Sequence, residues 1–342
     1  MTTNIPSISV ILPVYNGMGY LQLSVESVLN QLTGGFNFEF LICDDCSTDD
    51  SYAYLKTLDD SKVKLYKNEH NKGLFPTLNF LLKETTAPLV HLWAQDDVML
   101  PNCLESTLRF HKDFPNVNFS FSRLQHINEH GVLLEKPDTF QNRTISVQDH
   151  AISSILYGSI AGNIANVCLV KEAVERLGYF DASMKYVGDF KMWCLLSKDK
   201  PVGMNGSILV NVRRHSGQLS RNINASYSKL IENYEVYKCF LGTLHEDFKK
   251  PAKRALKWKI YPMYFNQFLY ILRNGNFKLA SRYLKGLKRY DIIPFLFIRW
   301  LTVKVLKVTK LERHFFDYIF FDEIVTVKER HQKSNIDQSI QH

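Results

Sequence analysis

Several features of well-known protein classes are missing from this 342-residue sequence. The N-terminus, MTTNIPSISVILPVYN, has neither the basic start nor the small-residue cleavage site of a secretory signal, so we expect a cytoplasmic protein. No uninterrupted apolar run reaches the roughly 18–20 residues that a membrane-spanning helix needs. A P-loop is absent, and the glycines of PVYNGMGY have the wrong spacing for a dinucleotide-binding turn. We therefore expect a metal ion, instead of a glycine-rich loop, to neutralise bound phosphates.

Cysteine is scarce, with six residues that do not form a disulfide framework, so we expect reduced thiols. One pair, Cys43 and Cys46, has the C-x-x-C spacing of a redox dithiol or of half a zinc site. Two aspartates lie between the sulfur atoms, and their charge would raise the thiol pKa that a redox site needs to lower. A zinc site would need a second pair of ligands, and no other C-x-x-C occurs. We interpret both cysteines as small hydrophobic residues at a strand end.

Charge is distributed unevenly along the chain. Residues 1–240 carry 22 Lys and Arg against 25 Asp and Glu, whereas residues 241–342 carry 20 against 9. The formal net charge of +8 therefore comes entirely from the C-terminal part. This asymmetry indicates two functional regions and argues against a uniformly basic nucleic-acid binder, so we expect no nucleic-acid partner.

Strand and helix patterns alternate along the first part of the chain. The predicted elements are strands at 8–16, 38–45, 62–68 and 87–97, and helices at 19–32, 52–58, 74–85 and 101–114. This alternation predicts an α/β fold with a mainly parallel sheet and helices on both faces. Further along, we expect a catalytic domain to end at residue 222, a helical basic region at 223–331 and a disordered tail at 332–342.

Polar clusters follow three of the predicted strands. They are Tyr15–Asn16, Asp44–Asp45 and Asp96–Asp97. Ligands of parallel sheets bind beyond the carboxyl ends of the strands, so we expect the three clusters to converge. Consecutive carboxylates at a buried strand end repel each other and lose hydration, and folding alone would not select them. Helix capping is the structural alternative for Asp44 and Asp45.

The two aspartate pairs suit different parts of a nucleotide ligand. A carboxylate of Asp44 or Asp45 could accept the imide N–H of a uracil or thymine ring. Asp96 and Asp97 offer hard oxygen ligands for Mg²⁺ or Mn²⁺, which typically enter a site with a substrate diphosphate. The sequence therefore predicts a site for a nucleotide and a metal at one edge of the sheet.

Four segments of the chain resemble the successive signature blocks of family 2 glycosyltransferases, which have the GT-A fold. They are SVILPVYNGMGYLQLSVESVLNQ, FEFLICDDCSTDDS, NEHNKGLFPTLNFLLKETTAPLVHLWAQDDVMLP and LGYFDASMKYVGDFKMWCLL. The resemblance covers about residues 7–220, and four blocks in the right order and spacing are far more specific than any one of them.

The resemblance implies an inverting enzyme that uses a nucleotide-diphosphate sugar and a divalent metal, Mn²⁺ or Mg²⁺. It assigns Asp97 to the metal, Asp96 to the sugar or ribose, and Asp189 to the general base. The other donor-binding residues that it implies are Pro13, Tyr15, Asn16, Asp44, Asp45 and Lys72. Two positions depart from the family's pattern, because Gly188 replaces the first acid of the later acidic pair and Gln95 replaces the first aspartate of the metal motif.

Two of these regions have structural alternatives. Asp189 begins a predicted helix in YVGDFKMWCLL, so it could be a helix cap instead of a base. Arg214 and His215 lie in VRRHSGQLS, which we interpret as a mobile loop that closes over the donor diphosphate. His215 is either a further metal ligand or a solvated loop residue.

Residues 251–310 interleave aromatic and aliphatic residues with Lys and Arg, as do helices that lie on an anionic membrane surface. The most apolar part, IIPFLFIRWLTVKVLKV, is interrupted by Arg299 and Lys304, so we do not expect it to span a membrane. The alternative is that these helices pack on the catalytic domain or on one another, with their lysines facing water.

We therefore predict an inverting glycosyltransferase that moves a sugar from a nucleotide-diphosphate sugar, of the UDP or dTDP type, to a hydroxyl of a glycan or lipid-linked acceptor. By family analogy it would extend a bacterial surface polysaccharide at the cytosolic face of the membrane. The first alternative is a nucleotidyltransferase, because it also combines a nucleotide with a metal. The second is a non-catalytic carbohydrate- or nucleic-acid-binding module, which leaves the three polar clusters without a role.

Overall fold

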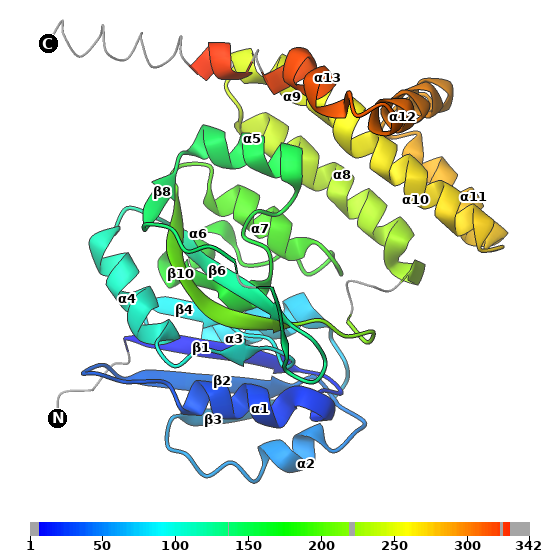
Figure 1. The fold of residues 1–342 in the computed structure, drawn as a ribbon. Helices are drawn as coiled ribbons and strands as arrows, with labels where there is room; N and C mark the ends of the chain where they lie inside the picture. Colours follow the sequence, from blue (N-terminus) through cyan, green and yellow to red (C-terminus); the bar gives the residue numbers. More distant parts are fainter. Residues whose placement is uncertain (1–6, 136, 219–222, 322–323, 329–342) are drawn as a thin grey trace, which may run out of the picture. The chain divides into compact units, whose positions relative to one another are not determined.

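The structure, a computed structural model, describes residues 7–135, 137–218, 223–321 and 324–328. The chain divides into two compact units (Figure 1). Unit 1 comprises residues 1–147 and 161–221, and unit 2 comprises residues 148–160 and 222–342. The domain limits expected from the sequence stay predictions, and the predicted disordered tail at 332–342 lies outside the described residues.

Unit 1 is built on one mixed sheet. Its strands are β1 Ile8–Val14, β2 Phe38–Asp44, β3 Val63–Lys67, β4 Leu89–Leu92, β5 Val98–Met99, β6 Phe119–Ile127, β7 Leu133–Glu135, β8 Arg143–Ile145, β9 Val167–Val170 and β10 Val202–Arg213. They are ordered β3-β2-β1-β4-β9-β6-β10-β5, with β7 paired to β6 and β8 paired to β10. Strands β3, β2, β1 and β4 are parallel, whereas β9 runs antiparallel to both of its neighbours.

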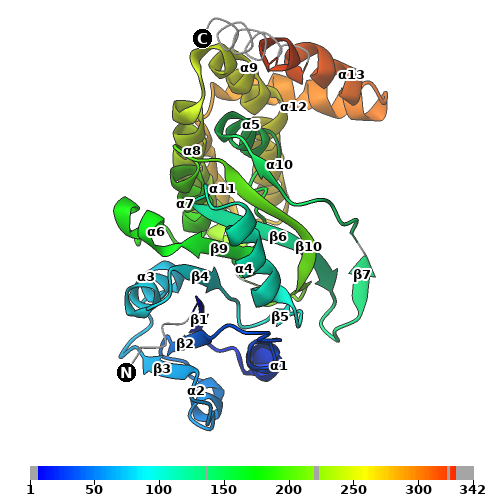
Figure 2. The same cartoon turned by 90° about the vertical axis from the view of Figure 1, so that its left-hand side faces the viewer.

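Helices surround this sheet. They are α1 Met18–Leu29, α2 Ser51–Leu55, α3 Leu74–Glu84, α4 Cys103–Asp113, α6 Lys171–Leu177 and α7 Gly188–Leu196. Figure 2 shows α1 and α3 on opposite faces of β1 and β2. The predicted α/β class, a sheet flanked by helices and followed by a helical C-terminal region, is therefore confirmed.

The two central strands explain why the site forms where it does. Every residue of β2 is buried, as is every residue of β1 except the partly buried Pro13. A strand covered on both faces needs a nearly continuous apolar run in place of alternation, and ISVILPV and FEFLICD come close to this. Their buried polar residues Ser9 and Glu39 are hydrogen-bonded to each other at 2.6 Å. Their register places Val14 opposite Asp44. Polar residues that follow the two strands therefore emerge at the same edge of the sheet.

The fourth predicted strand is shorter than the sequence suggests. We expected a strand at 87–97, but β4 ends at Leu92, and Asp96 and Asp97 lie in a turn before the short strand β5. The turn forms because β5 leaves the line of β4 and pairs with β10 instead. Its start is held to α1, where Ser24 Oγ donates a hydrogen bond to Ala94 O at 2.9 Å.

Unit 2 is helical. Its helices are α5 Val147–Tyr157, α8 Ser226–Thr243, α9 Glu246–Ala255, α10 Tyr261–Arg273, α11 Phe277–Leu287, α12 Ile293–Val308 and α13 Glu312–Phe316, with π-helical turns at Leu256–Ile260 and Asp317–Phe321. Buried residues such as Leu230, Phe265 and Tyr283 form its core. Among the residues that the structure describes, no helix is both long enough and apolar enough to cross a membrane.

Candidate active site

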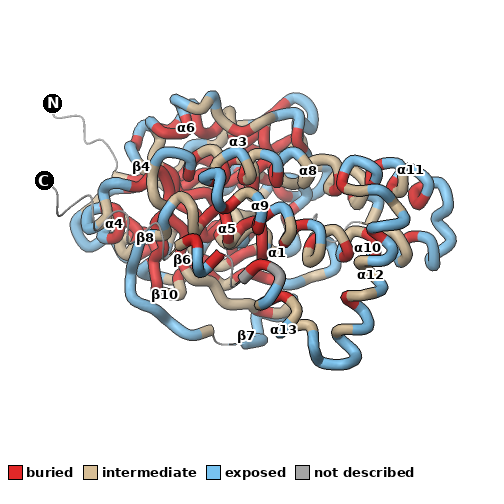
Figure 3. The backbone as a smooth tube through the Cα atoms, turned by 90° about the horizontal axis from the view of Figure 1, so that it is seen from above, coloured by how far each residue is buried: buried red, intermediate tan, exposed pale blue. Residues whose placement is uncertain are grey.

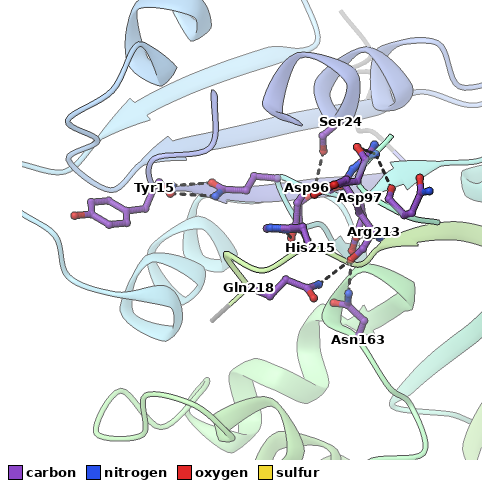
Figure 4. Close-up of polar contacts among 12 residues, drawn as sticks. Tyr15, Ser24, Asp96, Asp97, Asn163, Arg213, His215 and Gln218 are labelled. Atoms are coloured by element: carbon purple, nitrogen blue, oxygen red, sulfur yellow. Dashed lines mark hydrogen bonds and ion pairs between the residues drawn. The ribbon is translucent and has the colours of Figure 1, made fainter. Parts of the chain in front are cut away.

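The side chain of Gln95 joins the end of β1 to the turn that follows β4. Its Oε1 accepts a hydrogen bond from Tyr15 N at 2.8 Å, and its Nε2 donates to Tyr15 O at 3.0 Å (Figure 4). A Cβ on Gly17 would lie 2.7 Å from this amide, so a larger residue there would have to displace the Gln95 side chain. An aspartate in place of Gln95 would have no donor for the Tyr15 carbonyl. The departure from the family's pattern therefore has a structural reason.

Asn16 ties the end of β1 to the loop after β2. Its Oδ1 accepts a hydrogen bond from Thr48 N at 2.8 Å, and its backbone N–H donates to Ser47 Oγ at 3.0 Å. Its φ of 49° lies in the left-handed region, which asparagine tolerates better than most residues. The ring of the preceding Tyr15 is exposed and points away from the Asp96 and His215 side chains (Figure 4).

Asp45 organises the loop that carries Lys72. Its carboxylate is 3% exposed and accepts hydrogen bonds from Asn68 Nδ2 at 2.7 Å, Lys72 N at 2.9 Å and Gly73 N at 2.8 Å. Gly73 has a φ of 89°, a conformation that glycine adopts without strain. Asp45 thus holds the NKG loop by its backbone, and the side chain of Lys72 stays exposed.

Asp44 and Cys43 are buried at the end of β2. Asp44 is fully buried, and its Oδ2 accepts a hydrogen bond from Ser47 N at 3.2 Å, whereas its Oδ1 has no hydrogen-bond partner. Burial, with the charges of Asp45 and Asp44, raises the pKa of the Cys43 thiol to about 12. A thiol with such a high pKa is not a redox nucleophile, which agrees with our interpretation of Cys43 as a small hydrophobic residue.

Asp97 is committed to contacts within the protein. It is 1% exposed, its Oδ1 accepts a hydrogen bond from Arg213 N at 2.9 Å, and its Oδ2 accepts one from Asn163 Nδ2 at 2.9 Å. Burial, followed by the charge of Asp96, raises its pKa well above the usual range. The carboxylate of Asp97 therefore joins the turn after β4 to the end of β10 and to the segment before β9.

Asp96 faces His215 instead. Its Oδ2 lies 2.9 Å from His215 Nε2, and the two side chains are partly exposed, at 23% and 16% (Figure 4). The ring of Tyr20 lies against that of His215, with centroids 4.9 Å apart. Among the described residues, no group of three or more His, Cys, Asp or Glu side chains is placed to hold a metal. This pair could therefore bind a cation only together with other ligands.

Arg213 fixes the backbone next to the Asp96–His215 pair by hydrogen bonds. It is 2% exposed, and its guanidinium donates hydrogen bonds to the backbone oxygens of Asp96, Asn128 and Glu129 at 3.0–3.2 Å. The same guanidinium lies over the ring of Tyr20, 4.6 Å from its centroid. One buried cation thus fixes the backbone of Asp96 and the aromatic ring that lies against His215.

Asp189 lies in the first turn of α7 and is partly buried. Its Oδ1 accepts a hydrogen bond from the N–H of the next residue, Phe190, at 2.8 Å. A Cβ on Gly188 would lie 2.8 Å from the ring of Phe75, so this ring fills the space that the family's first acid would need. The contacts described above join Asp96, Asp97 and His215 into one network through Arg213, and Asp189 lies on a separate element, α7.

The sequence model of the glycosyl transferase family 2 matches residues 9–163, which include the ends of β1, β2 and β4. The first part of the chain thus matches glycosyl transferase family 2. This match bears out the resemblance inferred from the four sequence blocks, and Asp96, Asp97 and Asn163 of the network lie within the matched residues.

The chain is similar to several bacterial proteins. An uncharacterised glycosyltransferase of Rickettsia prowazekii is 25% identical over 245 residues, covering 71% of this chain and 74% of the relative. The Escherichia coli UDP-Glc:alpha-D-GlcNAc-diphosphoundecaprenol beta-1,3-glucosyltransferase WfgD is 27% identical over 197 residues, 57% of this chain and 71% of that protein. The crystal structure of S. aureus TarS 1-349 with UDP-GlcNAc has a TM-score of 0.60 at 16% identity, covering 96% of this chain and 92% of that fragment. This last similarity confirms the predicted GT-A-type fold.

Two residues of the candidate site, Tyr20 and Asn163, were missed in the sequence. Arg213 was assigned to the mobile loop together with Arg214 and His215, but it is the buried last residue of β10. For Arg213 a signal existed, because neighbouring residues of a strand point to opposite faces, so only one arginine of the VRRH segment can point inwards. The structure places Arg213 inside and leaves Arg214 exposed. Tyr20 and Asn163 carried no comparable signal in the sequence. They contact His215, Arg213 and Asp97 only because folding brings distant segments together.

Proposed function

We propose that this family 2 transferase is an inverting enzyme that moves a sugar from a nucleotide-diphosphate sugar to a hydroxyl of a lipid-linked glycan, in bacterial surface polysaccharide synthesis. The observation that carries the proposal is the Asp96–His215 pair, 2.9 Å apart and supported by a buried arginine at the edge where parallel strands end. The names of the relatives WfgD and WfaP specify UDP-Glc as donor and a GlcNAc-diphosphoundecaprenol acceptor, and TarS structures contain UDP-GlcNAc or UDP. These names favour a UDP-sugar over a dTDP-sugar for this chain.

Asp96 and His215 would hold a divalent cation, Mn²⁺ or Mg²⁺. A carboxylate oxygen and an imidazole nitrogen that face each other and are partly exposed suit such an ion, with remaining ligands from the donor diphosphate. Asp97 suits the ion less well than the sequence suggests, because it is buried and both of its oxygens already accept hydrogen bonds. When bound, the cation would supply positive charge that stabilises the leaving diphosphate.

The nucleoside would lie against the exposed ring of Tyr15, at the strand ends organised by Pro13, Asn16 and Asp45. Asp45 holds the backbone of the Lys72 loop, so a uracil imide N–H that reached this carboxylate would compete with Lys72 N and Gly73 N. Asp44 is too deeply buried to meet a ligand directly, and we infer that it shapes the end of β2. The exposed side chain of Arg214 would neutralise donor phosphate oxygens.

The reaction needs one base on the face of the sugar opposite the leaving group. Asp189 would take the proton of the acceptor hydroxyl as that oxygen attacks the anomeric carbon. The bond from the anomeric carbon to the diphosphate oxygen breaks in the same step, so the configuration at this carbon inverts. Asp189 is the acidic residue of the fourth signature block, and its partial burial leaves the carboxylate able to meet a substrate.

A nucleotide-release assay with the full-length protein tests the proposal. We expect UDP release from a UDP-hexose with Mn²⁺ and a diphosphoundecaprenol-linked acceptor, and an anomeric configuration opposite to that of the donor. Asp189→Asn should lower kcat by about 100-fold or more without changing the melting temperature. Retention of most of the rate would refute the assignment of the base. Pyrophosphate release from nucleoside triphosphates, without turnover of sugar nucleotides, would identify a nucleotidyltransferase instead.

A lipid-linked acceptor places the reaction at a membrane. We propose that the enzyme works at the cytosolic face and that its basic C-terminal region contacts anionic lipids. The charge of residues 241–342, with 20 basic and 9 acidic side chains, supports this part of the proposal.

A further inference from the structure

Helix α12 carries apolar side chains on the side opposite its own buried contacts. Leu296 and Val303 are buried in unit 2. The exposed apolar residues of the opposite side are Ile298 (53%), Leu301 (47%), Val305 (54%) and Val308 (85%). Their spacing of three, four and three residues aligns them along one face of the helix, which we call the α12 stripe.

A helix that is apolar on all sides normally lies in a protein core or in a membrane. In α12 one apolar side meets the helical core of unit 2 and the other is exposed. Figure 3 shows exposed residues, in pale blue, along this part of the chain. Contiguous exposed apolar residues mark interaction sites more often than isolated ones do. The α12 stripe is therefore a surface that needs a partner.

The charge around the stripe identifies the kind of partner. Residues 251–310 contain fourteen Lys and Arg but a single acid, Asp291, which forms an ion pair with Arg299. Lys304 follows Leu301 by three residues, so it flanks the stripe, and it is exposed. Lys307 follows the buried Val303 by four residues, so it lies on the other side of the helix, where it contacts Glu312 at 3.5 Å. A second copy of the chain on this face would bring lysines against lysines, since α12 contains no acid. Anionic lipid headgroups would instead neutralise them.

We propose that the α12 stripe is a docking surface for an anionic phospholipid membrane. The four apolar side chains enter the boundary between headgroups and acyl chains, while the stem of Lys304 lets its ammonium group stay at the phosphates. The helix lies in the plane of the membrane and does not cross it, in agreement with its length and charge. This inference rests on the membrane part of the proposed function and makes no assumption about catalysis.

Vesicle co-sedimentation of the full-length protein tests the docking surface. We expect binding to phosphatidylglycerol-containing vesicles at low salt and little binding to pure phosphatidylcholine vesicles. The double variant Leu301→Ser/Val305→Ser should bind the anionic vesicles with an affinity lower by about tenfold or more, because it removes the apolar contact. Both positions are exposed, so the variant should fold. The matched control, Val132→Ser/Leu134→Ser, changes apolar residues of unit 1 that are 60% and 51% exposed, and should bind as the wild type does.

Three outcomes would overturn the docking surface. They are absence of wild-type binding to anionic vesicles, unchanged binding of the double variant, and a wild-type dimer that the variant converts to a monomer without any vesicle binding. Stabilisation by UDP and Mn²⁺, measured in the same samples, separates this inference from the proposed function. A wild type that binds vesicles but not UDP would support the docking surface and contradict the donor assignment.

Discussion

Replacing Arg213 with lysine tests how the site is supported. The guanidinium of Arg213 donates hydrogen bonds to three backbone oxygens, and it is buried. Lysine keeps the positive charge, but its single ammonium group cannot span the oxygens of Asp96 on one side and Asn128 and Glu129 on the other. The substitution therefore removes hydrogen bonds of the guanidinium from the site while it preserves the positive charge.

The expected cost follows from two groups, because Glu129 is exposed and Asn128 O also accepts from Gly131 N. Lysine should leave the Asp96 oxygen without its donor and bury an ammonium group with too few acceptors, and each such group costs about 1–3 kcal/mol. We expect Arg213→Lys to reduce the free energy of unfolding by about 2–4 kcal/mol. For a unit of this size, that corresponds to a fall in melting temperature of roughly 6–12 °C.

Thermal unfolding and Mn²⁺ titration together check the prediction. Because Asp96 loses the donor that fixes its backbone, the apparent affinity for Mn²⁺ in the presence of UDP should fall along with the stability. Arg214→Lys is the matched control, since the neighbouring arginine is exposed, and should change the free energy of unfolding by less than about 0.5 kcal/mol. If Arg213→Lys melts within 2 °C of the wild type, as roughly expected for a surface change, the guanidinium contacts do not support the site.

Two further substitutions test individual contacts. Gly188→Ala should lower stability by about 1–3 kcal/mol in urea unfolding, because the new methyl group would meet the Phe75 ring, whereas Gly242→Ala, with no atom within 4 Å of the added carbon, should not. An unchanged midpoint for Gly188→Ala would show that this ring moves aside easily. Gln95→Glu should cost about 1 kcal/mol, because it loses the donor to Tyr15 O, and it should leave Mn²⁺ affinity unimproved. Tighter Mn²⁺ binding would mean that this position takes part in the metal site.

The fold and the position of the site could be predicted from the order of apolar runs and polar strand ends. Continuous apolar runs specify strands that are buried on both faces, and the residues just beyond them must emerge at the sheet edge. The CDDC segment illustrates this local logic, because the two carboxylates between the sulfurs already argued against a redox dithiol. The structure agrees, with the pKa of Cys43 raised to about 12 by burial and by both aspartates.

The different surroundings of Asp96 and Asp97, one partly exposed and one buried, could not be predicted in this way. The two residues are chemically identical neighbours, and the family resemblance assigned the metal to Asp97, the one that the structure buries. The choice depends on Arg213, which lies more than a hundred positions away and donates to both through its backbone and side chain. A hydrogen bond between such distant residues forms only when β10 packs beside the turn that follows β4. No local sequence pattern specifies this packing.

The sequence by itself determined the α/β order, the family, the acidic strand ends and the separation of charge between the two parts of the chain. These properties are local or compositional, so each can be recognised within a few neighbouring residues. Only the tertiary structure decided which aspartate is buried, why Gln95 and Gly188 depart from the family's pattern, and which side of α12 is exposed. All of these depend on which surfaces meet when distant segments pack, and burial and hydrogen-bond pairing exist only after that packing has occurred.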